Sequence, residues 1–210
     1  MERQPLYKIL PSADSYFIMF KKIFPLLLLC TAVVFPSYSA GIMFKKERID
    51  AVIRSPDTLE IRGIYWFFNE DASATSAAIY YPFPLDSLSA YPHYITVTRL
   101  TQKQPIRFDT LPEGIRWDMK FSAKDGDSVL VVYRQRVSRM QGRYIVTTAR
   151  LWGRPLQSAK FSVTVPPGLI LDYWSYKYDT LCIQGDTLIY YSRHAPFSPE
   201  VDMLMRWRYK

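Results

Sequence analysis

Residues 115–121 read Ile-Arg-Trp-Asp-Met-Lys-Phe, and apolar side chains occupy every second position. Successive side chains of an extended strand point to opposite faces, so this period of two predicts a strand with one packed face and one solvated face. The same alternation recurs at residues 129–137, 160–165 and 201–210. Further strands with less contrast are expected at residues 48–53, 59–69, 77–81, 94–100, 144–151, 169–176 and 188–192. The sequence therefore predicts about eleven strands.

The segments between these strands contain turn residues and no amphipathic helix of useful length. Hairpin loops are expected at residues 125–127 (Asp-Gly-Asp) and 185–186 (Gly-Asp), and residues 166–168 (Pro-Pro-Gly) separate two strands. A parallel architecture needs long crossovers, which are usually helical, so we exclude it. The predicted fold class is all-β: a single antiparallel β-sandwich, Ig-like or jelly-roll-like, over residues 40–210.

A hydrophobic signal helix is predicted ahead of the strands. Lys21 and Lys22 precede an apolar run at residues 23–35, and small residues follow it, which is typical of a secretory signal cleaved after Ser39. The run is shorter than the ~20 residues of a membrane-spanning helix. Because the basic pair follows Met19 so closely, our hypothesis is that Met19 is the true start and residues 1–18 are an extension. The alternative is an uncleaved signal that tethers the chain to the inner membrane through residues 19–39.

The two cysteines do not predict a disulfide. Cys30 lies inside the signal and follows Leu29, whereas lipoprotein processing needs a small residue before the cysteine, so lipidation is not favoured. Loss of the signal would leave Cys182 as the single cysteine of the mature chain. Its apolar neighbours, Leu181 and Ile183, predict a small buried side chain rather than a nucleophile.

The charge of the chain favours anionic partners. Removal of residues 1–39, which hold four basic and two acidic side chains, lowers the formal net charge from +8 to +6. A positive excess favours contact with anionic surfaces but does not determine the fold. Nucleic acid is not expected as a partner of an exported protein, and the predicted localisation is periplasmic or secreted.

No catalytic motif stands out, and we predict no cofactor, no metal site and no enzymatic activity. HExxH, CxxC, GxSxG, P-loop and GxGxxG patterns are all missing from the sequence. A hydrolase that uses His93 or His194 with a nearby serine and aspartate is the alternative, although both histidines adjoin proline-bearing turns. Asp125 and Asp127 supply too few oxygens for calcium, which takes six to eight.

The first candidate binding surface consists of arginines at outward positions of two predicted strands. These are Arg134 and Arg136 on one strand and Arg206 and Arg208 on another. If the two strands share a sheet, the four guanidinium groups form one face that binds phosphate through forked hydrogen bonds. The alternative is an ordinary solvated face.

The second candidate surface is the aromatic segment at residues 80–83, with Tyr80, Tyr81 and Phe83. Prolines on both sides of Phe83 indicate that a strand ends here at a sheet edge. Exposed rings would form a platform for a glycan or a protein partner, whereas rings on both faces of a covered strand would belong to the core.

Two stretches resemble a group of exported bacterial β-sandwich domains of uncharacterised role. The first combines residues 64–69 with the Tyr-Tyr-Pro-Phe-Pro sequence at residues 80–84, and the second combines residues 132–135 with residues 144–148 and 151–152. The resemblance implies a periplasmic or surface sandwich and brings no catalytic residue. We therefore expect an exported, non-enzymatic cell-envelope or secreted module that binds a protein or an anionic envelope component.

Overall fold

The computed structural model describes residues 41–210, and within this range the chain forms fourteen strands and a short 3-10 helix, η2 (Thr147–Trp152). The all-β fold class with mainly antiparallel pairing is confirmed. No helix of this range is long and apolar enough to cross a membrane. The predicted extension, the Met19 start, the signal, the cleavage after Ser39 and the fate of Cys30 lie outside the described residues.

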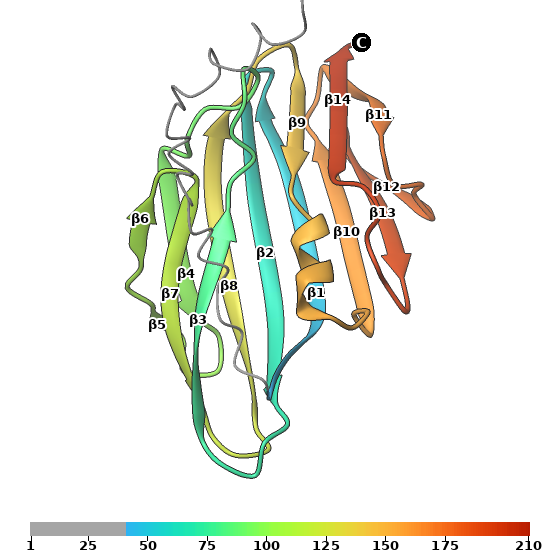
Figure 1. Ribbon diagram of the computed structural model, residues 1–210. Coiled ribbons are helices and arrows are strands. Elements are labelled where there is room, and N and C mark those ends of the chain that lie inside the picture. The colour runs from blue at the N-terminus through green and yellow to red at the C-terminus, as the bar shows by residue number, and fades with distance from the viewer. Residues whose placement is uncertain (1–40) are drawn as a thin grey trace, which may run out of the picture. The chain divides into compact units, whose positions relative to one another are not determined.

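The largest element of the fold is an eight-stranded sheet (Figure 1). Its strands, in spatial order, are β12 (Thr180–Gln184), β13 (Thr187–His194), β10 (Ser158–Val165), β1 (Ile42–Ser55), β2 (Thr58–Asn69), β8 (Gly126–Arg136), β4 (Tyr94–Arg99) and β5 (Gln104–Pro105).

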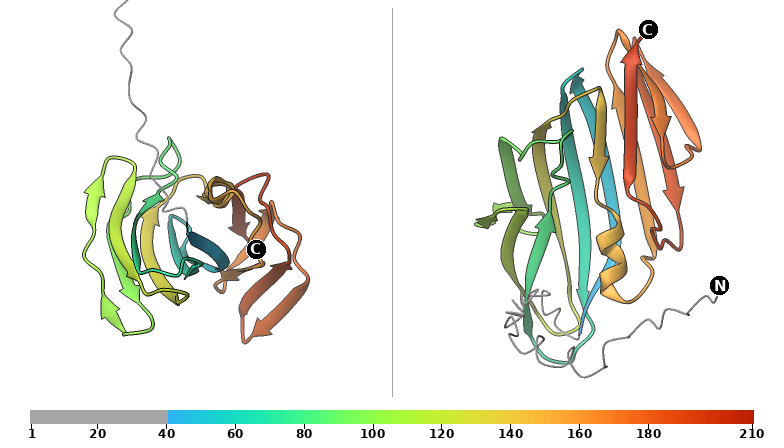
Figure 2. Two further views of the ribbon diagram at one scale, coloured as in Figure 1. Left: turned by 60° about the horizontal axis from the view of Figure 1, so that its bottom comes forward. Right: turned by 45° about the horizontal axis from the view of Figure 1, so that its top comes forward.

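Two three-stranded sheets lie side by side against one face of the large sheet (Figure 1). Figure 2 shows the strands after residue 158 gathered at one end of this assembly and β4 to β7 at the other. The hydroxyl of Tyr65 on β2 lies 2.9 Å from that of Tyr81 in one small sheet and 3.0 Å from that of Tyr144 in the other. The first small sheet contains β3 (Thr75–Pro82), β7 (Gly114–Phe121) and β6 (Asp109–Leu111), and the second contains β11 (Leu169–Trp174), β14 (Met203–Tyr209) and β9 (Gln141–Tyr144).

The period-two pattern divides the large sheet into an inner and an outer face. On β2 the residues Leu59, Ile61 and Phe67 are buried and point to the inner face, where the small sheets pack. The intervening Ile64 and Trp66 are half-buried on the outer face, which no strand of residues 41–210 covers. One continuous core therefore lies between the large sheet and the two small ones.

The prediction of an antiparallel sandwich was wrong for one pair of strands. Strand β1 pairs with β10 in parallel, from Lys46 opposite Ser158 to Val52 opposite Thr164. The connection between the two strands contains β2 to β9 and η2, so strands supply the crossover that we expected only helices to supply.

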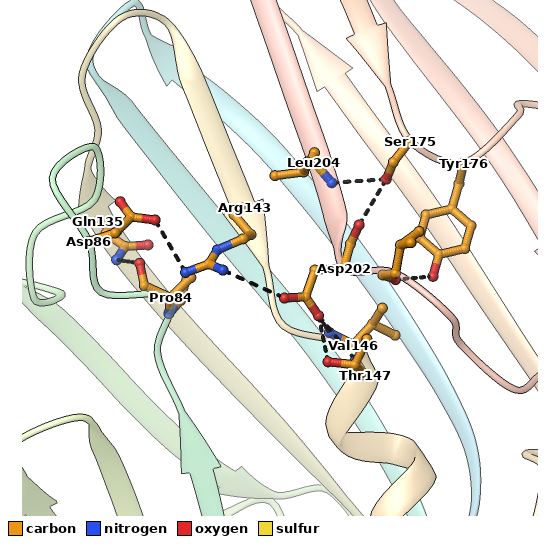
Figure 3. Close-up of polar contacts among 11 residues, drawn as sticks. Pro84, Asp86, Gln135, Arg143, Val146, Thr147, Ser175, Tyr176, Asp202 and Leu204 are labelled. Carbon is orange, nitrogen blue, oxygen red and sulfur yellow. Dashed lines mark hydrogen bonds and ion pairs between the residues drawn. The ribbon is translucent and has the colours of Figure 1, made fainter. Parts of the chain in front are cut away.

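The strand predicted at residues 144–151 was also wrong, because β9 ends at Tyr144 and η2 follows. Asp202 accepts hydrogen bonds from the backbone N–H groups of Val146 and Thr147, each at 3.2 Å, and from the Thr147 hydroxyl at 2.7 Å. Arg143 bridges Asp202 and Asp86, at 3.8 and 3.2 Å (Figure 3). These long-range contacts favour a turn where the local sequence favours a strand.

Two of the three predicted turns are confirmed. The hairpin loop predicted at residues 125–127 is not formed, because β8 begins at Gly126 and residues 122–125 connect β7 to β8 in a different sheet. Gly185 connects β12 to β13 with a φ of 58°. Gly168, with a φ of 83°, separates β10 from β11. Both glycines adopt a left-handed conformation that strains other residues. The expected burial of Cys182 is met only in part, since this side chain is half-buried on β12.

Candidate functional site

The four predicted arginines lie on two different sheets. Arg134 and Arg136 belong to β8 of the large sheet, whereas Arg206 and Arg208 belong to β14 of a small sheet. The predicted common face is therefore not formed. The alternation of the two strands is the same, but alternation does not determine which sheet a strand joins.

Arg134 also has a structural partner. Glu60 on the outer face is fully buried, and Arg54, Arg62 and Arg134 each approach its carboxylate to 2.6 Å. Burial opposes the charged form of Glu60, but the hydrogen bonds from Arg54, Arg134 and Arg62 outweigh it and lower the pKa of Glu60 to about 2. The charge of Arg134 thus serves this ion-pair network and is not free for a ligand.

The aromatic segment is not an exposed platform. Tyr81 and Phe83 are buried, and their rings pack against Tyr133 with centroids 6.1 and 5.0 Å apart. Tyr80 is half-buried and donates a hydrogen bond of 3.3 Å to the Glu113 carbonyl. The segment does end a strand at a sheet edge, because β3 is the outer strand of its sheet and stops at Pro82. Tyr81 and Phe83 therefore belong to the core and do not form a binding platform.

The two histidines lie in different environments. His93 is exposed in the loop before β4. His194 on β13 packs among Phe161, Tyr176 and Phe197, and its Nε2 lies 2.8 Å from the Ser192 hydroxyl. Burial lowers the pKa of His194, and the nearby Asp179 carboxylate opposes this shift. Since Ser192 is only 3% exposed, the Ser192–His194 contact stabilises the core and does not present a hydroxyl to solvent.

A hollow of about 700 Å³ lies over β1, β10 and β13 on the outer face of the large sheet. We call it the basic hollow, because its lining contains four cationic residues and only two acidic ones. Trp66 and Tyr191 add aromatic rings to its wall. Its lining comprises Lys46, Glu47, Arg48, Asp50, Trp66, Ser158, Lys160, Phe161, Ser162, Tyr191 and Arg193.

Three of the cations form a row across neighbouring strands. Lys160 on β10 is the Cα partner of Arg48 on β1 and of Arg193 on β13. Adjacent strands are only ≈ 4.7–4.9 Å apart, so like charges at partnered positions repel one another and destabilise the sheet. We call Arg48, Lys160 and Arg193 the cationic row.

Few acidic groups neutralise this row. Asp50 binds Arg48 at 3.0 Å and accepts a 2.7 Å hydrogen bond from the Ser162 hydroxyl. Within residues 41–210, the side chains of Lys46, Lys160 and Arg193 form no ion pair with a carboxylate. The hollow therefore presents unpaired positive charge next to aromatic rings, which suits phosphate or carboxylate groups.

Comparison with known proteins identifies the fold but no family. No family model and no curated protein matches the chain. A Legionella pneumophila protein provisionally described as a nutrient-binding protein has a similar structure, with a TM-score of 0.65 and 13% identity over 82% of this chain and 68% of that chain. This similarity shows the fold alone.

An M1 zinc metallopeptidase of Deinococcus radiodurans is a more distant structural match. It has a TM-score of 0.47 and 10% identity, and the match covers 80% of this chain but 43% of the peptidase chain. Among residues 41–210, no group of three or more histidines, cysteines or carboxylates is placed to hold a metal ion.

The cationic row was not among the sequence-predicted sites. Lys160 lies between the apolar residues Ala159 and Phe161, which is an ordinary signal for an outward-facing side chain. Arg48 and Arg193 each have a polar neighbour, Glu47 and Ser192, so the local pattern does not single them out. Only the parallel pairing of β1 with β10 brings Arg48 beside Lys160, and no feature of the local sequence predicts that pairing.

Proposed function

We propose that this protein is an exported, non-enzymatic module of the cell envelope or its surroundings that binds an anionic envelope component in the basic hollow. The observation that carries the proposal is the cationic row, in which three partnered positions on β1, β10 and β13 hold Arg48, Lys160 and Arg193. Their mutual repulsion is an energetic cost in the free protein that a bound anion would offset.

The wall of the hollow supports a phosphate- or carboxylate-bearing ligand. A guanidinium group offers a planar fork of donors to such groups, and Arg48 and Arg193 stand at the two ends of the row. Trp66 and Tyr191 supply ring faces against which a sugar or the apolar part of a ligand can pack. An acidic glycan and an anionic lipid headgroup share this chemistry.

Two further features agree with an exported binding role. The signal expected at residues 19–39 would deliver the chain across the inner membrane, and the mature chain keeps its positive charge. The nutrient-binding description of the Legionella protein is also compatible with a binding module, although that similarity concerns the fold.

The experiment compares the purified protein with the triple variant Arg48→Gln/Lys160→Gln/Arg193→Gln. The probes are polygalacturonate, as a soluble carboxylate polymer, and phosphatidylcholine vesicles with or without phosphatidylglycerol. We expect the wild type to bind one of the anionic probes, with affinity that falls as salt rises, and the triple variant to lose about tenfold or more. The probe that binds distinguishes a glycan source from a lipid source.

A matched control replaces three exposed cations away from the hollow, as Arg107→Gln/Arg116→Gln/Lys120→Gln. Both triple variants lose three positive charges, so a general charge effect would weaken their binding of the anionic probe equally. Equal losses, or no binding of either anionic probe by the wild type, would overturn the proposal.

A further inference from the structure

A second, smaller cavity of about 50 Å³ enters the core between the two small sheets. Figure 1 shows β3 and η2 on either side of β2, and residues of all three elements line the cavity. Tyr80, Ile145 and Thr148 lie along its half-buried part, and Glu47 of β1 lies among its buried residues. We call this space the glutamate crevice. It is lined from the inner face of β1, whereas the cationic row points to the outer face.

Glu47 is a buried carboxyl group without a counterion. Glu47 is 3% exposed, and its Oε1 has no hydrogen-bond partner within residues 41–210. No lysine, arginine or histidine of this range forms an ion pair with it. Burial raises the pKa of Glu47 to about 8, and the Tyr144 hydroxyl opposes this rise. A buried polar atom without a partner is costly, and such an atom in a cavity marks a candidate binding site.

The other titratable groups that line the glutamate crevice are tyrosines, not cations. Tyr65 of β2 is hydrogen-bonded to Tyr81 of β3 and Tyr144 of β9, and burial raises the pKa of all three phenols. Burial also raises the pKa of Tyr176, which senses the charge of Glu47. These phenols are therefore neutral at physiological pH. Their oxygens can accept hydrogen bonds from a ligand, but they supply no positive charge that would balance Glu47.

Aromatic rings form much of the remaining wall. The Trp152 ring of η2 lies 5.8 Å from the Phe44 ring and 5.4 Å from the Phe67 ring, between centroids. The faces of aromatic rings attract cations, and a carboxylate enclosed by such rings is a favourable environment for an ammonium group. The volume limits the ligand to a few non-hydrogen atoms, since a water molecule takes ≈ 30 Å³ of liquid volume.

We propose that the glutamate crevice binds the head of a small primary amine, whose ammonium group donates hydrogen bonds to Glu47 and to the surrounding tyrosine hydroxyls. On binding, the Glu47 carboxyl releases its proton to solvent, and the ammonium charge takes its place as the compensating charge. The alkyl part of the amine lies toward Tyr80, Ile145 and Thr148, where the crevice is least buried.

The test titrates the full-length protein with methylammonium chloride and follows binding by the chemical shifts of the tyrosine ring protons. We expect saturable binding that is tighter at about pH 9 than at about pH 6, because Glu47 has to give up its proton. Methanol, which lacks the charge, and tetramethylammonium, which is too large and has no N–H donor, are expected not to bind.

Two variants examine the residues. Glu47→Gln is expected to weaken methylammonium binding about tenfold or more, through loss of a charge-assisted hydrogen bond. Thr148→Trp is expected to block the entrance while Glu47 remains in place. Glu113→Gln, which changes an exposed glutamate outside the crevice, is the charge-matched control and should bind as the wild type does.

Three results would overturn the inference: no saturable binding of methylammonium by the wild type, binding of methanol as tight as that of methylammonium, or undiminished methylammonium binding by both crevice variants. Circular dichroism verifies that each variant is folded, and Thr148→Trp keeps the test decisive if Glu47→Gln does not fold. The outcome is independent of the basic hollow, because the triple variant of that surface replaces no residue of the crevice and keeps Glu47, which borders both spaces.

Discussion

At the scale of single residues, Glu47 and Glu60 are two buried glutamates whose pKa values shift in opposite directions. Three arginines surround Glu60, and their hydrogen bonds lower its pKa to about 2 despite its burial. Glu47 forms no ion pair with a cation of residues 41–210, and burial raises its pKa to about 8. The difference follows from the neighbours, because a counterion stabilises the charged form and desolvation alone does not.

Replacement of Glu47 is expected to change how stability depends on pH. The pKa of Glu47 is about 8 in the folded state, against 4.5 for an ordinary glutamate, so between these limits the unfolded chain binds fewer protons than the folded one. The free energy of unfolding of the wild type therefore falls as pH rises from about 4.5 to about 8, by a few kcal/mol at about 1.4 kcal/mol per pKa unit. Glu47→Gln has no carboxyl group at this position, so its free energy of unfolding does not contain this decrease.

The measurement is urea unfolding of the wild type and Glu47→Gln at several pH values across this window. We expect the variant to gain stability relative to the wild type as pH rises, with Glu113→Gln showing no such trend. Parallel pH profiles for the wild type and Glu47→Gln would contradict the raised pKa of the buried carboxyl.

At the scale of elements, β10 has the clearest conflict between stability and the proposed function. Lys160 stands between Arg48 and Arg193 on the two strands that pair with β10. Lys160→Gln removes both repulsive contacts and keeps a long polar side chain at an exposed position. We expect it to raise the free energy of unfolding by about 0.2–1 kcal/mol at low salt and to weaken binding of the anionic probe.

Added salt separates this effect from a change in strand propensity. Screening reduces repulsion between exposed charges, so the advantage of Lys160→Gln should shrink in high salt. A variant that is less stable than the wild type at low salt would show that the row does not cost stability. The control is Lys120→Gln on β7, whose cross-strand partner is the uncharged Ser76.

Elements with strong alternation were predicted well, and elements formed by long-range contacts were not. Residues 115–121 predict β7 almost to its ends, since every second side chain packs into the core. Residues 144–151 also have apolar positions suited to a strand, yet the Asp202 carboxylate holds Val146 and Thr147 in a turn. Asp202 is distant in the sequence, so local patterns hold no information about it.

At the scale of the whole molecule, the sequence predicts which side chains face outward but not which of them become neighbours. Arg134 and Arg206 have the same alternation, but their strands join different sheets. Arg48 and Lys160 become neighbours through the parallel pairing of β1 with β10. A binding surface on a sheet depends on strand order, and strand order results from the packing of the whole chain. The candidate site could therefore be recognised only once the fold was known.

The parallel pairing also predicts that the domain unfolds as one unit. Strands β1 and β2 lie in the middle of the large sheet, and both small sheets pack on its inner face around one continuous core. Trp117 is buried in one small sheet and Trp207 in the other. In urea, Trp117→Phe and Trp207→Phe are each expected to show a single transition, with the same midpoint by tryptophan fluorescence and by far-ultraviolet circular dichroism. If a small sheet unfolded independently, the two midpoints would differ in at least one variant. Such a difference would mean that the β1–β10 pairing does not couple the two halves.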